Sequence, residues 1–252
     1  PMLRDTSRGI NFELPSNKSC ERRLRTLGNH LLTCTFLLTA WGAQAQSYFS
    51  ELAVFGDSLL DSGNYGSDRR ATNQLIDGSG QFADISPQYL AEYLGLDLTP
   101  AIEGGSNFAV GGYQTQNVLD SINGAGINTS FFGGGISPAY LDERANRIKP
   151  RALMLINGGG NDLNAIFASV APAAVPAAIG ARVSNFNAAI MALHQAGANY
   201  IMASNVPDLA LTPGPQAAFA SGLYNAAALA SISASTDGYN TLMAMASSDM
   251  LA

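Results

Sequence analysis

Short apolar runs alternate with longer segments of helical character along this chain. Four apolar runs predict buried strands, at residues 52–55, 107–110, 152–156 and 200–204. Ser-Pro pairs, helical composition and a stop signal at Gly197 predict helices at residues 86–94, 137–148, 175–195 and 216–233. Residues 121–136 are rich in Gly, Asn and Ser and are typical of a surface loop. This alternation predicts an α/β fold in which helices wrap a parallel sheet.

The first 45 residues have a different pattern, that of an export signal. A basic patch at residues 22–25 precedes a largely apolar run at residues 31–41, and residues 43–45 (Ala-Gln-Ala) offer small side chains for cleavage. The apolar run is shorter than the roughly 20 residues that span a bilayer. We therefore expect residues 1–45 to be a leader and secretory signal peptide, and the rest of the chain to be exported to the cell surface or the outside.

The charge and the cysteine content change when this leader is set aside. Residues 46–252 contain 7 basic and 16 acidic residues, a net charge of −9, which argues against nucleic acid as a partner. Both cysteines, Cys20 and Cys34, lie in the leader, and the remainder has a single histidine and no carboxylates at ligand spacing. The glycine loops lack the G-x-G-x-x-G spacing of a dinucleotide site. The sequence thus predicts no disulfide, no metal site and no cofactor.

Three polar positions follow predicted strands. Ser58, Gly112 and Asn161 each come just after the carboxyl end of a strand, where open parallel sheets bind ligands. A serine in a tight turn can attack a carbonyl carbon when a base takes its proton and N–H donors hold the oxyanion. The backbone N–H groups of Ser58 and Gly112 and the side-chain amide of Asn161 would be those donors. Gly111 is the alternative to Gly112, and the other two could instead be a helix N-cap and a turn residue.

The base that such a serine needs is missing from the expected site. His30 lies in the leader, and His194 lies six residues before the strand predicted at residues 200–204, near its amino end. A five-residue strand spans about 16 Å at roughly 3.3 Å per residue, so His194 is expected to be a solvated helix residue. Asp208 is expected at the correct edge of the sheet, but it is not assigned the role of catalytic acid.

Three ordered blocks make the chain resemble the GDSL (SGNH) hydrolase family. The blocks are residues 56–59 (Gly-Asp-Ser-Leu), 107–112 (Asn-Phe-Ala-Val-Gly-Gly) and 159–162 (Gly-Gly-Asn-Asp). The resemblance implies a flavodoxin-like three-layer α/β/α fold with a parallel sheet, and hydrolysis of carboxylic esters by an esterase or lipase. It also implies that Ser58 is the nucleophile and that Gly112 and Asn161 belong to the oxyanion hole.

Within this family, the chain is most similar to outer-membrane autotransporter esterases and lipases over roughly residues 50–235. The similarity extends through residues 63–64, 112–115, 195–198 and 206–213. It implies that residues 46–252 are a surface-displayed hydrolase passenger domain, anchored by a C-terminal β-barrel. The Asp-x-x-His block of the family does not occur here, so we expect an amino-terminal fragment that is inactive alone, with its catalytic Asp and His beyond residue 252. The alternative is a non-catalytic surface-binding or adhesin passenger on the same fold.

Overall fold

The part of the chain with a described structure falls within one of two units. A computed structural model describes residues 48–66, 75 and 77–249. The chain divides into Pro1–Ala45 and Gln46–Ala252, and the described residues belong to the second unit. The predicted leader and signal peptide therefore lies outside the described residues.

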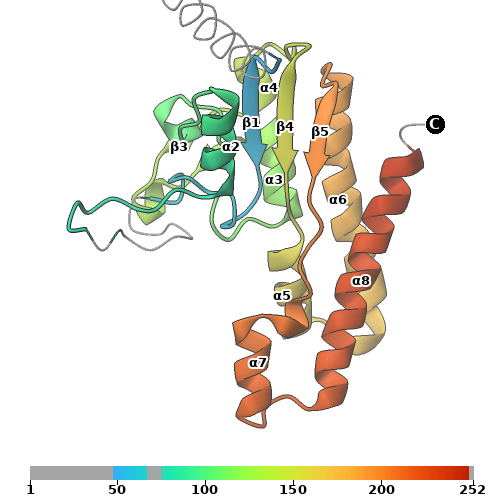
Figure 1. Ribbon diagram of the computed structural model, residues 1–252. Helices are drawn as coiled ribbons and strands as arrows, with labels where there is room; N and C mark the ends of the chain where they lie inside the picture. Colours follow the sequence, from blue (N-terminus) through green and yellow to red (C-terminus); the bar gives the residue numbers. More distant parts are fainter. Residues whose placement is uncertain (1–47, 67–74, 76, 250–252) are drawn as a thin grey trace, which may run out of the picture. The chain divides into compact units, whose positions relative to one another are not determined.

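Helices surround a three-stranded parallel sheet in this unit (Figure 1). The strand order is β1–β4–β5, with β1 at Glu51–Phe55, β4 at Ala152–Ile156 and β5 at Tyr200–Ala203. A separate antiparallel pair joins β2 (Ile127–Asn128) to β3 (Ile136–Ser137). The α-helices are α2 (Ser86–Leu94), α3 (Thr115–Asn123), α4 (Tyr140–Glu143), α5 (Gly160–Ser169), α6 (Val175–Gln195), α7 (Pro213–Ala220) and α8 (Ala226–Asp249). The 3-10 helices are η1 (Ala101–Glu103), η2 (Ser130–Phe132), η3 (Pro172–Ala174) and η4 (Leu209–Leu211).

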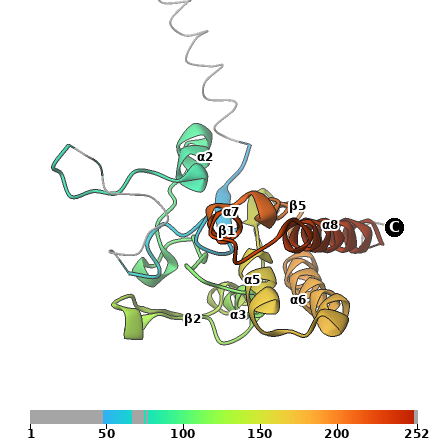
Figure 2. The same cartoon turned by 90° about the horizontal axis from the view of Figure 1, so that it is seen from below.

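The register of the sheet brings the carboxyl ends of its strands to one edge. Glu51 pairs with Ala152, and Leu153 pairs with Tyr200, all in parallel. Helices α3 and α6 lie on one side of the sheet and α2 lies on the other (Figure 2). The continuous apolar sequences of β1 and β4 fit strands that are covered on both faces. The predicted three-layer α/β/α arrangement is therefore confirmed.

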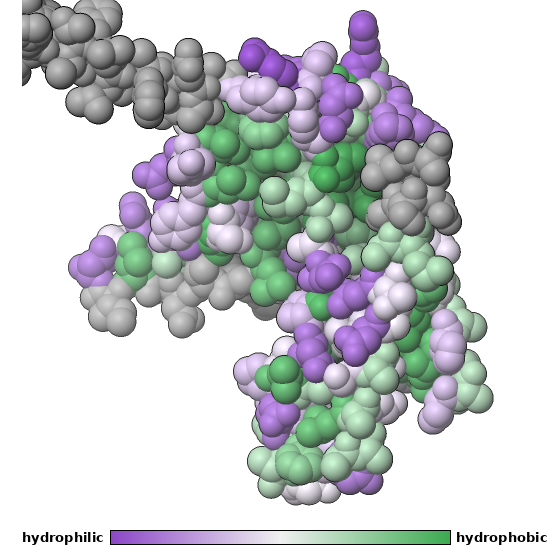
Figure 3. Space-filling view, turned by 45° about the vertical axis from the view of Figure 1, so that its right-hand side comes forward, coloured by the Kyte–Doolittle hydropathy of each residue, from purple (hydrophilic) through white to green (hydrophobic). Residues whose placement is uncertain are grey.

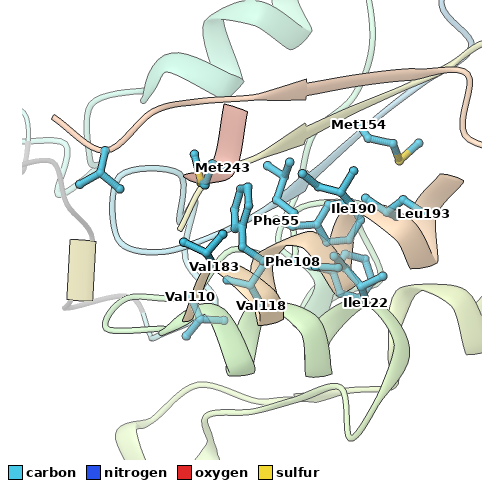
Figure 4. Packing of buried hydrophobic residues seen from close by; sticks show 14 of the residues in the cluster. Phe55, Phe108, Val110, Val118, Ile122, Met154, Val183, Ile190, Leu193 and Met243 are labelled. Atoms are coloured by element: carbon cyan, nitrogen blue, oxygen red, sulfur yellow. The ribbon is translucent and has the colours of Figure 1, made fainter. Parts of the chain in front are cut away.

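The thicker apolar layer lies between the sheet and helices α3 and α6. The rings of Phe55 and Phe108 stack with centroids 5.8 Å apart. Ile122 from α3 and Ile190 from α6 pack into the same cluster, which Figure 4 shows from close by. On the other face, Ala91 of α2 belongs to a smaller buried cluster. Burial on both faces fixes the strands, so the turns that follow them start from defined positions.

The run at 107–110 follows the edge of β1 without forming a regular strand. The backbone N–H of Phe108 donates to Val54 O at 2.6 Å, and that of Val110 donates to Gly56 O at 3.0 Å. Only isolated bridges to Val54 and Pro100 are formed at Asn107. The prediction of a regular strand here was wrong, because the run forms only isolated β-bridges and not a continuous ladder. The run nevertheless lies where a strand was expected, beside β1.

Two predicted helices are shorter or interrupted, and two helices were missed. After the short α4, Ala145 and Asn146 adopt φ values of +49° and +57°, which are incompatible with a right-handed helix. The segment predicted at 216–233 breaks into α7 and α8 around Gly222, where φ is +77°. Helices α3 and α5 directly follow glycine turns, and the composition of these turns concealed them. None of the helices described between residues 48 and 249 combines the length and apolar content needed to cross a membrane.

Candidate active site

The turn after β1 presents Ser58 with its polar groups unpaired. Gly56 has a φ of +154°, and a side chain there would collide with Oδ1 of Asn157. The chain therefore needs glycine where it leaves the strand. Ser58 is half-buried, and neither its hydroxyl nor its backbone N–H forms a hydrogen bond with any described residue. An unpaired donor and hydroxyl in a turn are available to a ligand.

Asp57 and Asn157 fasten this turn to the loop after β4. The backbone N–H of Asp57 donates to Asn157 Oδ1 at 3.0 Å, and Asn157 Nδ2 donates back to Asp57 Oδ1 at 3.1 Å. The same carboxylate oxygen accepts the backbone N–H of Leu59 at 3.0 Å. Both side chains of the pair are 6 % exposed. The position of Ser58 relative to the β4–α5 loop is thus fixed from both of its flanks.

Asp61 occupies the N–H of Gly111 and leaves that of Gly112 free. One oxygen of Asp61, Oδ2, accepts from Gly111 N at 2.8 Å, while Oδ1 accepts from Gly63 N at 2.8 Å and from Asn64 N at 2.7 Å. Gly112 has a φ of +83°, is exposed, and has no hydrogen-bond partner for its N–H among the described residues. Of the two glycines, Gly112 is therefore the one whose donor could serve a ligand.

Burial dominates the electrostatics of Asp61. Desolvation raises the pKa of its carboxyl above the usual 3.8, although hydrogen bonds from Gly63, Gly111, Asn64 and Tyr65 oppose the rise. Burial likewise raises the pKa of Tyr113, next to Gly112, to about 12, with Asp120 and Asp61 adding to the shift. Tyr113 is therefore a neutral group at physiological pH.

The side chain of Asn161 is oriented by the same segment. Asn161 is the second residue of α5, and its Nδ2 donates to Tyr113 O at 2.9 Å. One amide hydrogen is used in this bond, and the second remains for another acceptor. Because Tyr113 follows Gly112 directly, the bond ties the start of α5 to the segment that contains Gly112. Ser58 and Asn161 line one pocket, whereas Gly112 is not among the residues that line it.

A pocket of about 200 Å³ opens beside Ser58. Asn161 and Asn164 of α5 line it together with Ser58. The segment after β5 completes the wall with Ser204, Asn205, Val206, Pro207, Leu209 and Thr212. The described wall contains Asp57 as its one ionisable side chain. Neutral polar groups around a free hydroxyl and unpaired N–H donors can hold a carbonyl and stabilise negative charge on its oxygen.

Two neighbouring features have structural roles that the sequence did not reveal. A side chain on Gly159, where φ is +110°, would collide with the ring of Tyr239 from α8. The hydroxyl of Tyr239 donates to Gly158 O at 3.2 Å. Asp162 accepts the backbone N–H and the hydroxyl of Thr115, at 2.9 and 3.0 Å, and so caps the start of α3 rather than its own helix. No local pattern signals these contacts, because their partners are far apart in sequence.

Neither of the two remaining candidates lines the pocket that contains Ser58. His194 is exposed near the end of α6, as predicted, and does not line the pocket. Asp208 accepts Ala210 N at 2.9 Å and the hydroxyl of Ser233 at 2.8 Å, so it caps η4 and ties η4 to α8. Among residues 48–66, 75 and 77–249, no group of three or more His, Cys, Asp or Glu side chains could hold a metal ion.

A parallel sheet that presents a free serine and a set of N–H donors at its carboxyl edge defines a hydrolase-like α/β protein. Residues 52–246 match the model of the GDSL-like lipase/acylhydrolase family. The match covers more than half of the chain, and the chain belongs to this family.

Similar proteins include several from bacteria. An uncharacterized protein from the trpE-trpG intergenic region of Pseudomonas putida is 38 % identical, over 75 % of this chain and 33 % of its own length. Esterase EstA of Pseudomonas aeruginosa is 37 % identical, over 75 % of this chain and 34 % of its own. Lipase 1 of Photorhabdus luminescens is 30 % identical, over 77 % of this chain and 28 % of its own. The chain thus spans about a third of the length of these curated relatives.

Proposed function

We propose that the protein hydrolyses carboxylic esters, with Ser58 as the nucleophile. The observation that carries the proposal is that the hydroxyl and N–H of Ser58 are both unpaired in a pocket that also holds Asn161. The oxygen Oγ of Ser58 attacks the carbonyl carbon, and the negative charge on the former carbonyl oxygen is held by the N–H groups of Ser58 and Gly112 and by the Asn161 amide. The alcohol leaves with a proton, and water then releases the acid from the acyl-enzyme.

The proton of Ser58 needs an acceptor outside the described residues. His194 is the one histidine of that part of the chain, and it is exposed on α6 and absent from the pocket wall. We therefore place the catalytic Asp and His in a segment beyond residue 252. The outer edge of β5, where Met202 is 50 % exposed, offers a position for such a segment. With this segment the site would contain the acid–base pair that serine hydrolysis requires.

Export and display at the cell surface belong to the same proposal. Support comes from the signal-like pattern of residues 1–45 and from the low charge and net acidity of residues 46–252. The similar proteins are each about three times as long as the matched region, which leaves room in them for further parts. In this proposal, residues 46–252 are the passenger of an autotransporter in the outer membrane.

Hydrolysis of a p-nitrophenyl ester tests the enzymatic proposal. We expect turnover by the full-length protein, a loss of about a thousandfold or more in Ser58→Ala, and no turnover above the Ser58→Ala level by residues 1–252 alone. Ser106→Ala is the matched control, because the Ser106 hydroxyl donates to Leu52 O at 2.7 Å, away from the pocket. Equal turnover by the full-length protein and its Ser58→Ala variant would contradict the proposal. It would favour the alternative of a binding passenger.

A further inference from the structure

An uncharged arm projects from the fold beside the Ser58 pocket. The arm, residues 209–225, consists of η4, α7 and the turn before α8 (Figure 1). No charged side chain occurs between Asp208 and Asp237 in the sequence. In the space-filling view, hydrophobic residues and residues of intermediate hydropathy predominate over this lower projection, with scattered hydrophilic ones (Figure 3). Residues 46–252 carry 23 charged side chains, and none of them lies in the arm.

Three large apolar side chains of the arm face solvent. Leu211 is 74 % exposed, Phe219 is 45 % exposed and Leu223 is 77 % exposed. By contrast, Leu209 at the base of the arm is 6 % exposed and packs into the core. The arm is therefore anchored at its base and presents three large apolar side chains to solvent. Apolar exposure on a charge-free segment favours contact with an apolar partner.

Three polar side chains of the arm donate hydrogen bonds within the arm. The hydroxyl of Thr212 donates to Leu209 O at 2.7 Å, and the amide of Gln216 donates to Ala210 O at 2.7 Å. The hydroxyl of Ser221 donates to Ala218 O at 3.0 Å. Few side-chain donors are left for a polar partner, whereas a protein interface normally has a polar and charged rim. These features fit an apolar partner that offers neither charge nor specific hydrogen bonds.

The arm is continuous with the pocket. Leu209 and Thr212, at the base of the arm, line the pocket that contains Ser58. Leu59, the residue after Ser58, lines the same pocket and is 56 % exposed. A molecule held against the arm would therefore have its ester group near Ser58.

We infer that the arm binds the surface of an aggregated, electrically neutral lipid and delivers acyl esters from that surface to Ser58. Delivery of esters to Ser58 rests on the proposed ester hydrolysis, whereas lipid binding by the arm does not depend on it. Apolar side chains without basic neighbours enter a lipid interface through the hydrophobic effect alone. Anionic lipid gains nothing from an arm without Lys or Arg, and a net charge of −9 opposes it.

A fluorophore on the arm tests the binding half. In full-length Cys20→Ser/Cys34→Ser/Ser58→Ala protein, an environment-sensitive nitrobenzoxadiazole group is attached to Ser221→Cys, and phosphatidylcholine vesicles are added. We expect a blue shift and a severalfold rise in emission. The same label on Ser79→Cys, exposed in the turn that contains Asp77, is the control and should not respond. Adding phosphatidylglycerol should leave the response unchanged or weaken it.

Substitution of the exposed side chains completes the binding test. Leu211→Ser combined with Leu223→Ser should reduce vesicle affinity about tenfold or more, because two apolar groups no longer enter the lipid. Tyr93→Ser on α2, where the side chain is 77 % exposed, is the matched control and should bind normally. Each single variant is tested as well, in case the pair does not fold. An unresponsive label, an absolute need for anionic lipid, or a change of oligomeric state in place of a loss of lipid binding would overturn the inference.

The delivery half is tested with two substrates. The arm variants, with Ser58 intact, should hydrolyse a dissolved short-chain ester within about twofold of the parent, yet lose about tenfold or more on an emulsified long-chain ester. Equal losses on both substrates, or no loss on either, would overturn delivery. Failure of the proposed function would give a different result, because Ser58→Ala would then hydrolyse both substrates as fast as the parent. Vesicle binding would still measure the contribution of the arm.

Discussion

The two edges of the sheet hold two cavities with opposite character. The cavity at the amino edge is the larger, at about 530 Å³ against about 200 Å³ beside Ser58. In its wall, however, charged groups pair with one another: Glu51 accepts from Arg144 at 2.7 Å and lies 3.4 Å from Lys149. The carboxyl edge instead combines neutral groups with unpaired donors at Ser58 and Gly112. The chemistry of the lining groups, a free hydroxyl beside N–H donors, rather than cavity volume, therefore distinguishes the carboxyl edge.

Tyr140 takes part in the same set of contacts at the amino edge. Its buried hydroxyl donates to Glu51 Oε1 at 3.2 Å, and the guanidinium of Arg144 lies 3.9 Å above its ring centroid. Burial, followed by the nearby charge of Glu51, raises the pKa of Tyr140 well above its ordinary value. At the amino edge, Glu51, Tyr140 and Arg144 thus stabilise the fold through contacts with one another.

Substitution of Asn161, at the carboxyl edge, should have the largest effect on activity. Replacing it by Ala removes one oxyanion donor, and we expect kcat for ester hydrolysis by the full-length protein to fall about 10²- to 10³-fold with little change in KM. Asn164→Ala is the matched control: Asn164 lies one turn later on α5 and lines the same pocket, but it has no hydrogen bond that orients its amide within the described residues. Steady-state kinetics decide, and equal losses in both variants would remove Asn161 from the oxyanion site.

Asp61→Asn should mainly affect stability. The amide has a single acceptor oxygen, so N–H groups such as those of Tyr65 and Gly111, which now donate to Oδ2, would face a donor. We expect the free energy of unfolding to fall by about 2–4 kcal/mol in chemical denaturation. Asp77→Asn, at an exposed aspartate that accepts the backbone N–H of its near neighbour Ser79 at 2.9 Å, should change it by less than about 0.5 kcal/mol. Similar losses of unfolding free energy in Asp61→Asn and Asp77→Asn would contradict the structural role of Asp61.

The difference in unfolding free energy between the parent and Asp61→Asn should depend on pH, and the sign of this dependence follows from the pKa of Asp61. Burial raises the pKa of folded Asp61 above 3.8, so the folded chain binds this proton more tightly than the unfolded chain. The stability that Asp61 contributes is therefore greatest below pH 3.8 and declines as the pH rises through the raised value. Because Asn cannot titrate, the stability gap between the parent and Asp61→Asn should narrow above pH 3.8. A gap that widens over this range would show that the pKa of Asp61 is lowered.

Glu51→Gln should have the smallest effect. Its partners are partly solvated, with the side chains of Arg144 and Lys149 exposed by 24 % and 65 %, so we expect a loss of about 1–2 kcal/mol in stability that shrinks with added salt. Ester hydrolysis should stay within about twofold of the parent. The measurement is denaturation at low and high salt together with the ester assay. A large loss of activity at unchanged stability would assign a function to the amino edge.

Much of the reactive edge could be predicted because its signals are local. Apolar runs located β1, β4 and β5 to within a residue, and position after the strands singled out Ser58, Gly112 and Asn161. The contacts that organise the edge were not predictable, because they join distant segments. Asp57 meets Asn157 across 100 residues, and Asp61 meets Gly111 across 50. The sequence already favoured Gly112 over Gly111, and the hydrogen bond from Gly111 to Asp61 adds a physical reason.

Covalent labelling of the full-length protein with a fluorophosphonate tests the central claim most directly. The reagent phosphonylates serines that are activated as nucleophiles, and tandem mass spectrometry locates the adduct. The account predicts an adduct on Ser58, lost on denaturation before labelling, and none on Ser106 at the amino edge. An unlabelled Ser58 in protein that still hydrolyses esters, or an adduct on Ser106 instead, would contradict it.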